Sequence, residues 1–132
     1  GYRLYPEWVK APRSARGTLR VRYAWRNMGW GYCPVNIPQW NGRYTVGVAL
    51  LDGEGNAVAK WASDSTVLSE WLQGKAFVYS QEVSLEGVAP GRYTLAVGLV
   101  DRKNDLNPGL EVAVDPALKS SGWVCVNSIL IK

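Results

Sequence analysis

The feature that most constrains folding is a strict alternation of apolar and polar residues between positions 19 and 26. The apolar positions are Leu19, Val21, Tyr23 and Trp25, and the intervening ones are Arg20, Arg22, Ala24 and Arg26. Side chains of a β-strand point to opposite faces with a period of two, so this segment predicts a strand with one apolar and one basic face. Similar alternation marks residues 44–51, 57–62, 76–85, 93–101 and 123–131.

Turn signals separate these segments. The run DGEGN at 52–56 predicts a hairpin, and the pair Pro90-Gly91 predicts a turn before the next strand. Residues 63–75 carry apolar side chains three and four positions apart, which predicts one short helical turn. Pro6 interrupts the segment 2–10 and predicts either an edge strand or an entry segment. Residues 101–109 and 115–122 are expected to be loops, and 110–114 a short strand.

Seven or eight short strands without a repeating βα pattern predict an all-β fold. We expect an Ig-like or jelly-roll-type antiparallel β-sandwich of two sheets, with one short helical turn, formed by residues 1–132 as a single module. Tyr93 directly follows a turn, a placement in which the tyrosine hydroxyl bonds back to nearby backbone. The predicted core comprises Tyr23, Trp25, Val46, Val48, Phe77, Tyr93, Leu95 and Val97.

The composition narrows the possible functions. The chain has 47% hydrophobic and 20% charged residues, which is typical of a globular domain. It contains no histidine, so the commonest general base and most zinc sites are missing. No carboxylate pair or cofactor motif stands out, and the oxygen-rich loop 101–109 lacks the spacing of a known calcium loop. We therefore expect no enzymatic activity, no cofactor and no metal, and the absence of a long apolar run predicts no membrane span.

The connection 27–42 is the strongest candidate for a binding site, because it is far longer than a turn between strands requires. It holds the rings of Trp30, Tyr32 and Trp40, near Asn41 and Arg43. Aromatic planes stack on sugar rings, while amides and guanidinium groups bond sugar hydroxyls, a combination suited to carbohydrate. The alternative is that these rings fold back and cap the sandwich.

Seven tryptophans in 132 residues are unusually many, and some of them have no obvious place in the core. Trp25 continues an apolar strand face and is predicted to be buried. Trp61 is a further candidate ligand residue, and Trp8 or Trp123 would mark the site if the aromatic loop does not. The stripe formed by Arg20, Arg22 and Arg26 is interpreted as a solvated outer face in preference to a contact with an acidic polymer.

The two cysteines lie in different parts of the chain, Cys33 in the aromatic loop and Cys125 in the last predicted strand. In an oxidising compartment they could form a disulfide that closes a loop of about 90 residues, worth roughly 4 kcal/mol in the chain-entropy model. Two buried free thiols are the alternative.

Several motifs occur together in a characteristic order: WRNMG, VGVALLDGEGNAVAKW, EWLQG, VAPGRYTLAVGLVD and SSGWVCVNSILI. In this order they resemble the Ig-like β-sandwich domains appended to secreted bacterial glycoside hydrolases. The resemblance covers the chain from about Thr18 onward and departs from the pattern at Gln73, where proline is usual, and in the longer loop 27–42.

The resemblance implies a secreted, non-catalytic, carbohydrate-binding module that targets an attached glycoside hydrolase to a polysaccharide, with plant cell-wall β-glucans or xylans as the first expectation. It also allows a structural spacer that packs on a catalytic domain and binds no sugar. We expect a monomeric module with no nucleic-acid or membrane partner.

Overall fold

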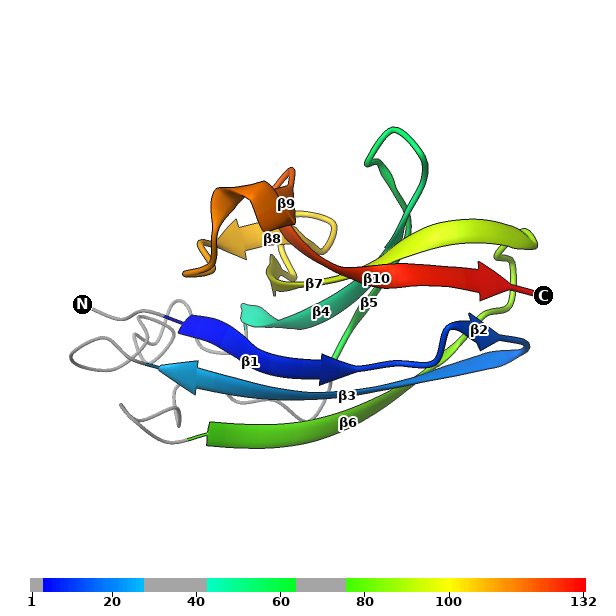
Figure 1. Ribbon diagram of the computed structural model, residues 1–132. Coiled ribbons are helices and arrows are strands. Elements are labelled where there is room, and N and C mark those ends of the chain that lie inside the picture. The colour runs from blue at the N-terminus through cyan, green and yellow to red at the C-terminus, as the bar shows by residue number, and fades with distance from the viewer. Residues whose placement is uncertain (1–3, 28–42, 64–75) are drawn as a thin grey trace.

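The computed structural model describes residues 4–27, 43–63 and 76–132, and shows an all-β domain of two sheets (Figure 1). The smaller sheet has the strand order β1-β3-β6, and the larger has the order β2-β10-β7-β4-β5, with β8 on β7 and β9 on β10. The smaller sheet consists of β1 (Leu4–Lys10), β3 (Thr18–Asn27) and β6 (Ala76–Ser84). The larger consists of β2 (Ser14–Ala15), β4 (Tyr44–Leu51), β5 (Ala57–Ala62), β7 (Gly91–Asp101), β8 (Asn107–Leu110), β9 (Lys119–Ser120) and β10 (Trp123–Ile131).

The main core lies between the two sheets, as the alternation predicts. Six of the eight predicted core residues are fully buried, namely Tyr23, Trp25, Val46, Val48, Leu95 and Val97. Phe77 and Tyr93 are only partly buried, although both pack against this core. The Tyr93 hydroxyl donates a 2.7 Å hydrogen bond to the backbone oxygen of Ala89, which confirms the predicted corner geometry.

The predicted edge position of Pro6 is confirmed as well. Strand β1 is the end strand of the smaller sheet and pairs with β3 through an irregularity between Pro6 and Trp8. An end strand can accommodate proline because its missing N–H need not bond a neighbour.

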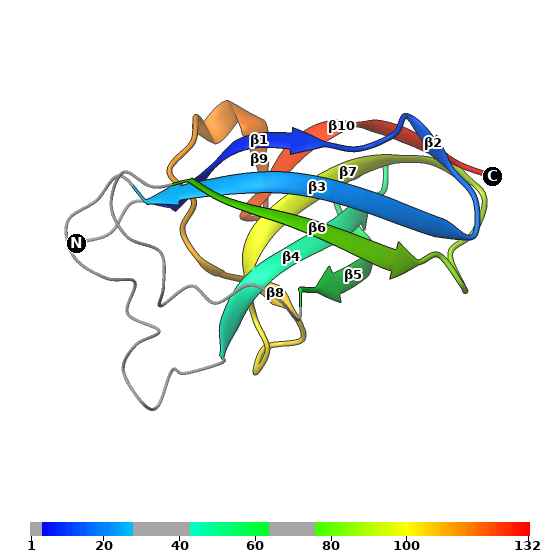
Figure 2. The ribbon, with the colours of Figure 1, turned by 90° about the horizontal axis from the view of Figure 1, so that it is seen from below.

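The larger sheet is mixed and curled, which corrects the expectation of purely antiparallel sheets (Figure 2). Strand β2 pairs with β10 in parallel, with Ser14 opposite Leu130 and Ala15 opposite Ile131. Here the backbone N–H groups of Leu130 and Lys132 donate to the oxygens of Arg13 and Ala15, each over 2.9 Å. The short segment thus supplies backbone partners that the last strand needs.

The segment after β7 also differs from expectation. The predicted strand at 110–114 is instead β8, which begins at Asn107 and ends at Leu110. Asp105 and Leu106 both have positive φ angles, so the chain reverses tightly and pairs at once with the end of β7. A 3-10 helix, η4 (Pro116–Leu118), lies in a segment predicted as loop. The helical turn predicted at 63–75 lies almost wholly outside the described residues.

A second, smaller apolar cluster lies on the opposite face of the larger sheet. The buried indole of Trp123 packs over Gly98, where an added Cβ would approach the ring carbon Cε3 to 3.1 Å. Ala49, Leu51, Ala96 and Val100 complete the buried part of this cluster. Both faces of the larger sheet therefore carry apolar residues, and Trp123 is part of the buried cluster on the outer one.

Candidate functional site

The end strand β5 of the larger sheet and the end strand β6 of the smaller sheet lie side by side (Figure 2). Residues of both strands line an open groove. Its volume is about 630 Å³, which lies within the range of about 300–1,000 Å³ found for small-molecule sites. Its lining combines one aromatic ring with several polar side chains. The lining residues are Lys60, Trp61, Ala62, Ser63, Ser80, Gln81, Glu82, Val83, Ser84 and Leu106.

Trp61 forms the apolar wall of this groove. It lies on β5 directly opposite Val48 of β4, and shares its strand face with Ala59. Both Trp61 and Ala59 pack against the main core, yet Trp61 remains only half-buried. The indole is thus held by the core on one side while part of its surface is open to the groove.

Two polar groove residues, Ser63 and Gln81, are held from the core side by Tyr23, which does not itself line the groove. The buried Tyr23 hydroxyl donates a 2.9 Å hydrogen bond to Oε1 of Gln81. Burial raises the pKa of Tyr23 to about 12, although a hydrogen bond with the Ser63 side chain acts in the opposite direction. The tyrosine is therefore neutral at ordinary pH and acts as a hydrogen-bonding group.

The backbone of Ser63 is fixed at three points. Its N–H donates to the oxygen of Val46 over 2.8 Å, and its carbonyl oxygen accepts from Thr45 Oγ1 at 3.0 Å and from Arg102 Nη2 at 2.9 Å. These contacts hold the end of β5 against β4 and β7. The polar end of the groove is consequently preorganised, which lowers the entropy lost on binding.

The sequence contains a signal for this cluster, a polar residue within an otherwise apolar alternating series. Phe77, Tyr79, Val83 and Leu85 occupy alternate positions, and Gln81 stands in the same series. An amide at an inward position must find a hydrogen-bond partner. Tyr23 lies on the neighbouring strand β3, and its hydroxyl supplies that partner.

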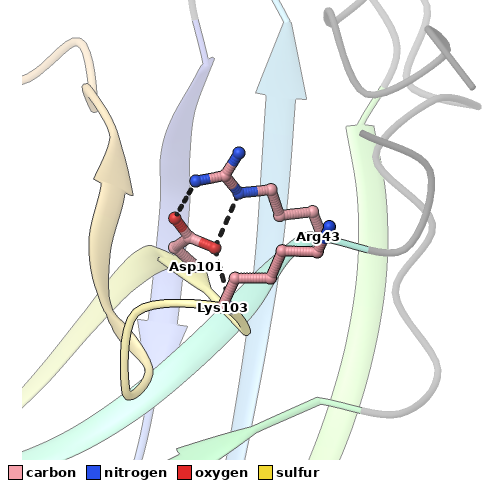
Figure 3. Close-up of polar contacts among 3 residues, drawn as sticks. All are labelled: Arg43, Asp101 and Lys103. Carbon is pink, nitrogen blue, oxygen red and sulfur yellow. Dashed lines mark hydrogen bonds and ion pairs between the residues drawn. The ribbon is translucent and has the colours of Figure 1, made fainter. Parts of the chain in front are cut away.

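Arg43, predicted as a sugar-binding residue, forms an ion pair with Asp101 (Figure 3). Its Nε and Nη2 donate to the two carboxylate oxygens of Asp101 over 2.9 and 2.8 Å. This hydrogen bonding lowers the pKa of Asp101, assisted by a 2.9 Å bond from the backbone N–H of Lys103. The bidentate contact uses two of the five guanidinium N–H groups, so a ligand could still be bonded through the others.

The oxygen-rich loop between β7 and β8 is also cross-linked by cations. Lys60 Nζ donates to the backbone oxygen of Asp105 over 2.6 Å, to its Oδ2 over 3.1 Å and to Oδ1 of Asn107 over 3.0 Å. Together with the Arg43–Asp101 pair, these contacts direct the loop oxygens toward side-chain nitrogens.

Most of the other predicted site residues lie outside the residues that the structure describes. Trp30, Tyr32, Trp40 and Asn41, together with Cys33, belong to residues 28–42, so their role stays a prediction. Cys125 is half-buried on β10, and burial raises the pKa of its thiol. Whether it forms a disulfide with Cys33 or stays a free thiol is left open, because Cys33 lies outside the described residues.

Trp8 and Trp123 are the alternative site residues that the sequence offers. Trp123 is 3% exposed and packs against the larger sheet, as described above. Trp8 is half-buried on β1, opposite Ala24 of β3 and away from the groove.

Comparison with known proteins identifies neither a family nor a curated relative, since no protein family and no curated protein matches the chain. Within the described residues, no helix has the length and apolar character required to cross a membrane.

Proposed function

We propose that the domain is a non-catalytic carbohydrate-binding module, and that the groove between β5 and β6 is part of its polysaccharide site. The observation that carries this proposal is the half-buried indole of Trp61 in a groove otherwise lined mainly by hydroxyl, amide and charged groups. A flat apolar wall beside a few fixed polar groups suits a sugar ring, which has apolar faces and a rim of hydroxyls.

The donors and acceptors of the lining fit this class of ligand. Ser80 and Ser84 lie on β6, and Gln81 and Ser63 lie nearer the core. Neutral hydroxyls and amides can both donate and accept hydrogen bonds, as sugar hydroxyls can. The groove is open, which would allow a polymer to lie along it.

The ligand class comes from the sequence resemblance. It favours a plant cell-wall β-glucan or xylan, and a secreted monomeric module that targets a covalently attached glycoside hydrolase. In this proposal Trp30, Tyr32, Trp40, Asn41 and Arg43 contribute from the aromatic loop and its end. Neither nucleic acid nor a membrane is expected as a partner, and no catalysis is expected.

The test is affinity electrophoresis in gels that contain β-glucan or xylan, with the variant Trp61→Leu. Leucine retains apolar volume against the core but lacks the flat ring, so we expect retention to weaken by about tenfold, equivalent to ~1.4 kcal/mol. Val58→Ala is the matched control, because Val58 lies on the same strand, is 52% exposed and is absent from the groove lining.

Trp40→Ala tests the aromatic loop in the same gels. A loss with Trp40→Ala but not with Trp61→Leu would place the sugar in the loop and reject the groove. If no glycan retards the wild-type domain, and deleting it destabilises its parent enzyme, the domain is a structural spacer instead.

A further inference from the structure

The outward face of the smaller sheet carries a second concentration of functional side chains on β1 and β3, whereas the groove is lined mainly from β5 and β6. Leu19, Val21, Tyr23 and Trp25 of β3 point into the core, so the alternate positions Arg20, Arg22 and Arg26 point outward. Lys10 of β1 joins them, since it is paired with Arg22 while its neighbour Val9 packs on the core. We call this surface the basic sheet face.

The cations of this face differ in their partners. Arg20 pairs with Glu82 over 2.9 Å, and Arg26 pairs with Glu7 over 3.0 Å. Within the described part of the chain, Lys10 and Arg22 form no ion pair. They lie directly opposite each other on adjacent strands, an arrangement that destabilises a sheet when the charges are alike. Folding therefore gains nothing from this pair, whereas a bound anion would be attracted by both cations.

An apolar row crosses the three strands beside these cations. Trp8 of β1 is opposite Ala24 of β3, which in turn is opposite Val78 of β6. Val78 is 56% exposed, and the Nζ of Lys10 lies 5.3 Å from the centre of the Trp8 ring. A cation over an indole is stabilised by the ring electrons without losing its charge. The face thus presents an aromatic ring beside two cations that form no ion pair with any residue that the structure describes.

We propose that the basic sheet face binds an acidic polysaccharide, with carboxylate groups at Lys10 and Arg22 and a sugar ring against Trp8. This site goes beyond the groove, because Lys10, Arg22 and Trp8 do not line it. Its charge density favours such a polymer over nucleic acid. The face holds four cations and two carboxylates. Duplex DNA carries one negative charge per about 1.7 Å, so this face offers too few cations to match that density.

The experiment measures binding of the domain to polygalacturonate by titration calorimetry at several salt concentrations. The double variant Lys10→Gln with Arg22→Gln should bind at least about tenfold more weakly at low salt. Its stability should stay close to that of the wild type, because the variant removes the repulsion of two like charges together with the contact of Lys10 with the Trp8 ring. The control Arg92→Gln with Lys103→Gln removes the same charge from exposed positions on β7 and its following turn, and should change affinity less than about twofold.

Further measurements distinguish this site from unspecific charge attraction and from a nucleic-acid site. Added salt should weaken wild-type binding, and Trp8→Ala should weaken it while leaving retention by neutral glucan unchanged. The proposal fails if polygalacturonate does not bind, or if both double variants lose affinity equally, since that would indicate unspecific charge attraction. Tighter binding of single-stranded DNA, lost in the Lys10/Arg22 variant, would make the surface a nucleic-acid face instead. Unchanged affinity in Trp8→Ala would refute the role of the ring.

Discussion

Replacing Tyr23 with Phe tests whether the polar end of the groove is as buried as the structure indicates. The change removes the hydroxyl that donates to Gln81 over 2.9 Å. A neutral hydrogen bond of this kind contributes about 1 kcal/mol net. Because Gln81 also lines the groove, water can reach its freed oxygen and keep the loss near that value. We therefore expect Tyr23→Phe to lower the free energy of unfolding by about 1 kcal/mol at about pH 8.

The same variant should behave differently in alkali. The folded pKa of Tyr23 is raised from 10.0 to about 12, so the unfolded chain loses this proton first as the pH rises. The stabilisation linked to the neutral hydroxyl is thus fully present below the unfolded pKa and is lost as the pH rises toward the folded one. At about pH 11 the free energy of unfolding of the wild type should therefore have fallen by about 1.4 kcal/mol. The phenylalanine variant has no hydroxyl at this position and cannot show this decrease.

Urea unfolding followed by tryptophan fluorescence at the two pH values measures this difference directly. The wild type should be the more stable protein at the lower pH, and the two proteins should be equally stable, or their order reversed, at the higher pH. Other tyrosines titrate in both proteins and cancel in the comparison. A stability difference that stays constant between the two pH values would refute the reasoning, since Tyr23 would then titrate alike in both states.

Three further predictions concern the core and the ion pair. Trp25→Ala should lower the free energy of unfolding by about 3–5 kcal/mol, because the indole is fully buried; a loss below ~1 kcal/mol in urea titration would contradict that burial. Gly47→Ala should destabilise by about 1–3 kcal/mol, since a Cβ there would overlap Val100, and adding Val100→Ala should recover part of the loss in thermal unfolding. Asp101→Asn should destabilise at neutral pH, and its difference from wild type should shrink as the pH falls, because pairing with Arg43 lowers the pKa of the carboxyl in the folded state; an acid titration with a constant difference would contradict this.

Local patterns in the sequence predicted most of the strands. The alternation at 19–26, 44–51 and 123–131 corresponds to β3, β4 and β10 within a residue or two. For β3 this success has a physical reason, because its alternation reflects one face in the core and one largely solvated face. Strand β4 is instead buried on both faces, and its apolar, β-branched residues mark it as a strand. Tyr93 and Pro6 were also predictable, since a corner hydroxyl bond and an edge proline depend on nearby backbone.

The tertiary structure alone decided how these strands are paired. The parallel contact of β2 with β10 and the early start of β8 depend on backbone partners that are distant or set by a tight reversal. The position of Trp123 over Gly98 likewise requires two strands to be adjacent.

The tertiary structure also decided which residues meet in the two candidate surfaces. Trp61, Ser63 and Gln81 form a groove only because the end strands of two sheets lie side by side, and Lys10 meets Arg22 only through the register of β1 on β3. Alternation determines which face a side chain occupies, whereas register and sheet order determine its neighbours. Those depend on contacts between distant segments, which a local pattern does not encode.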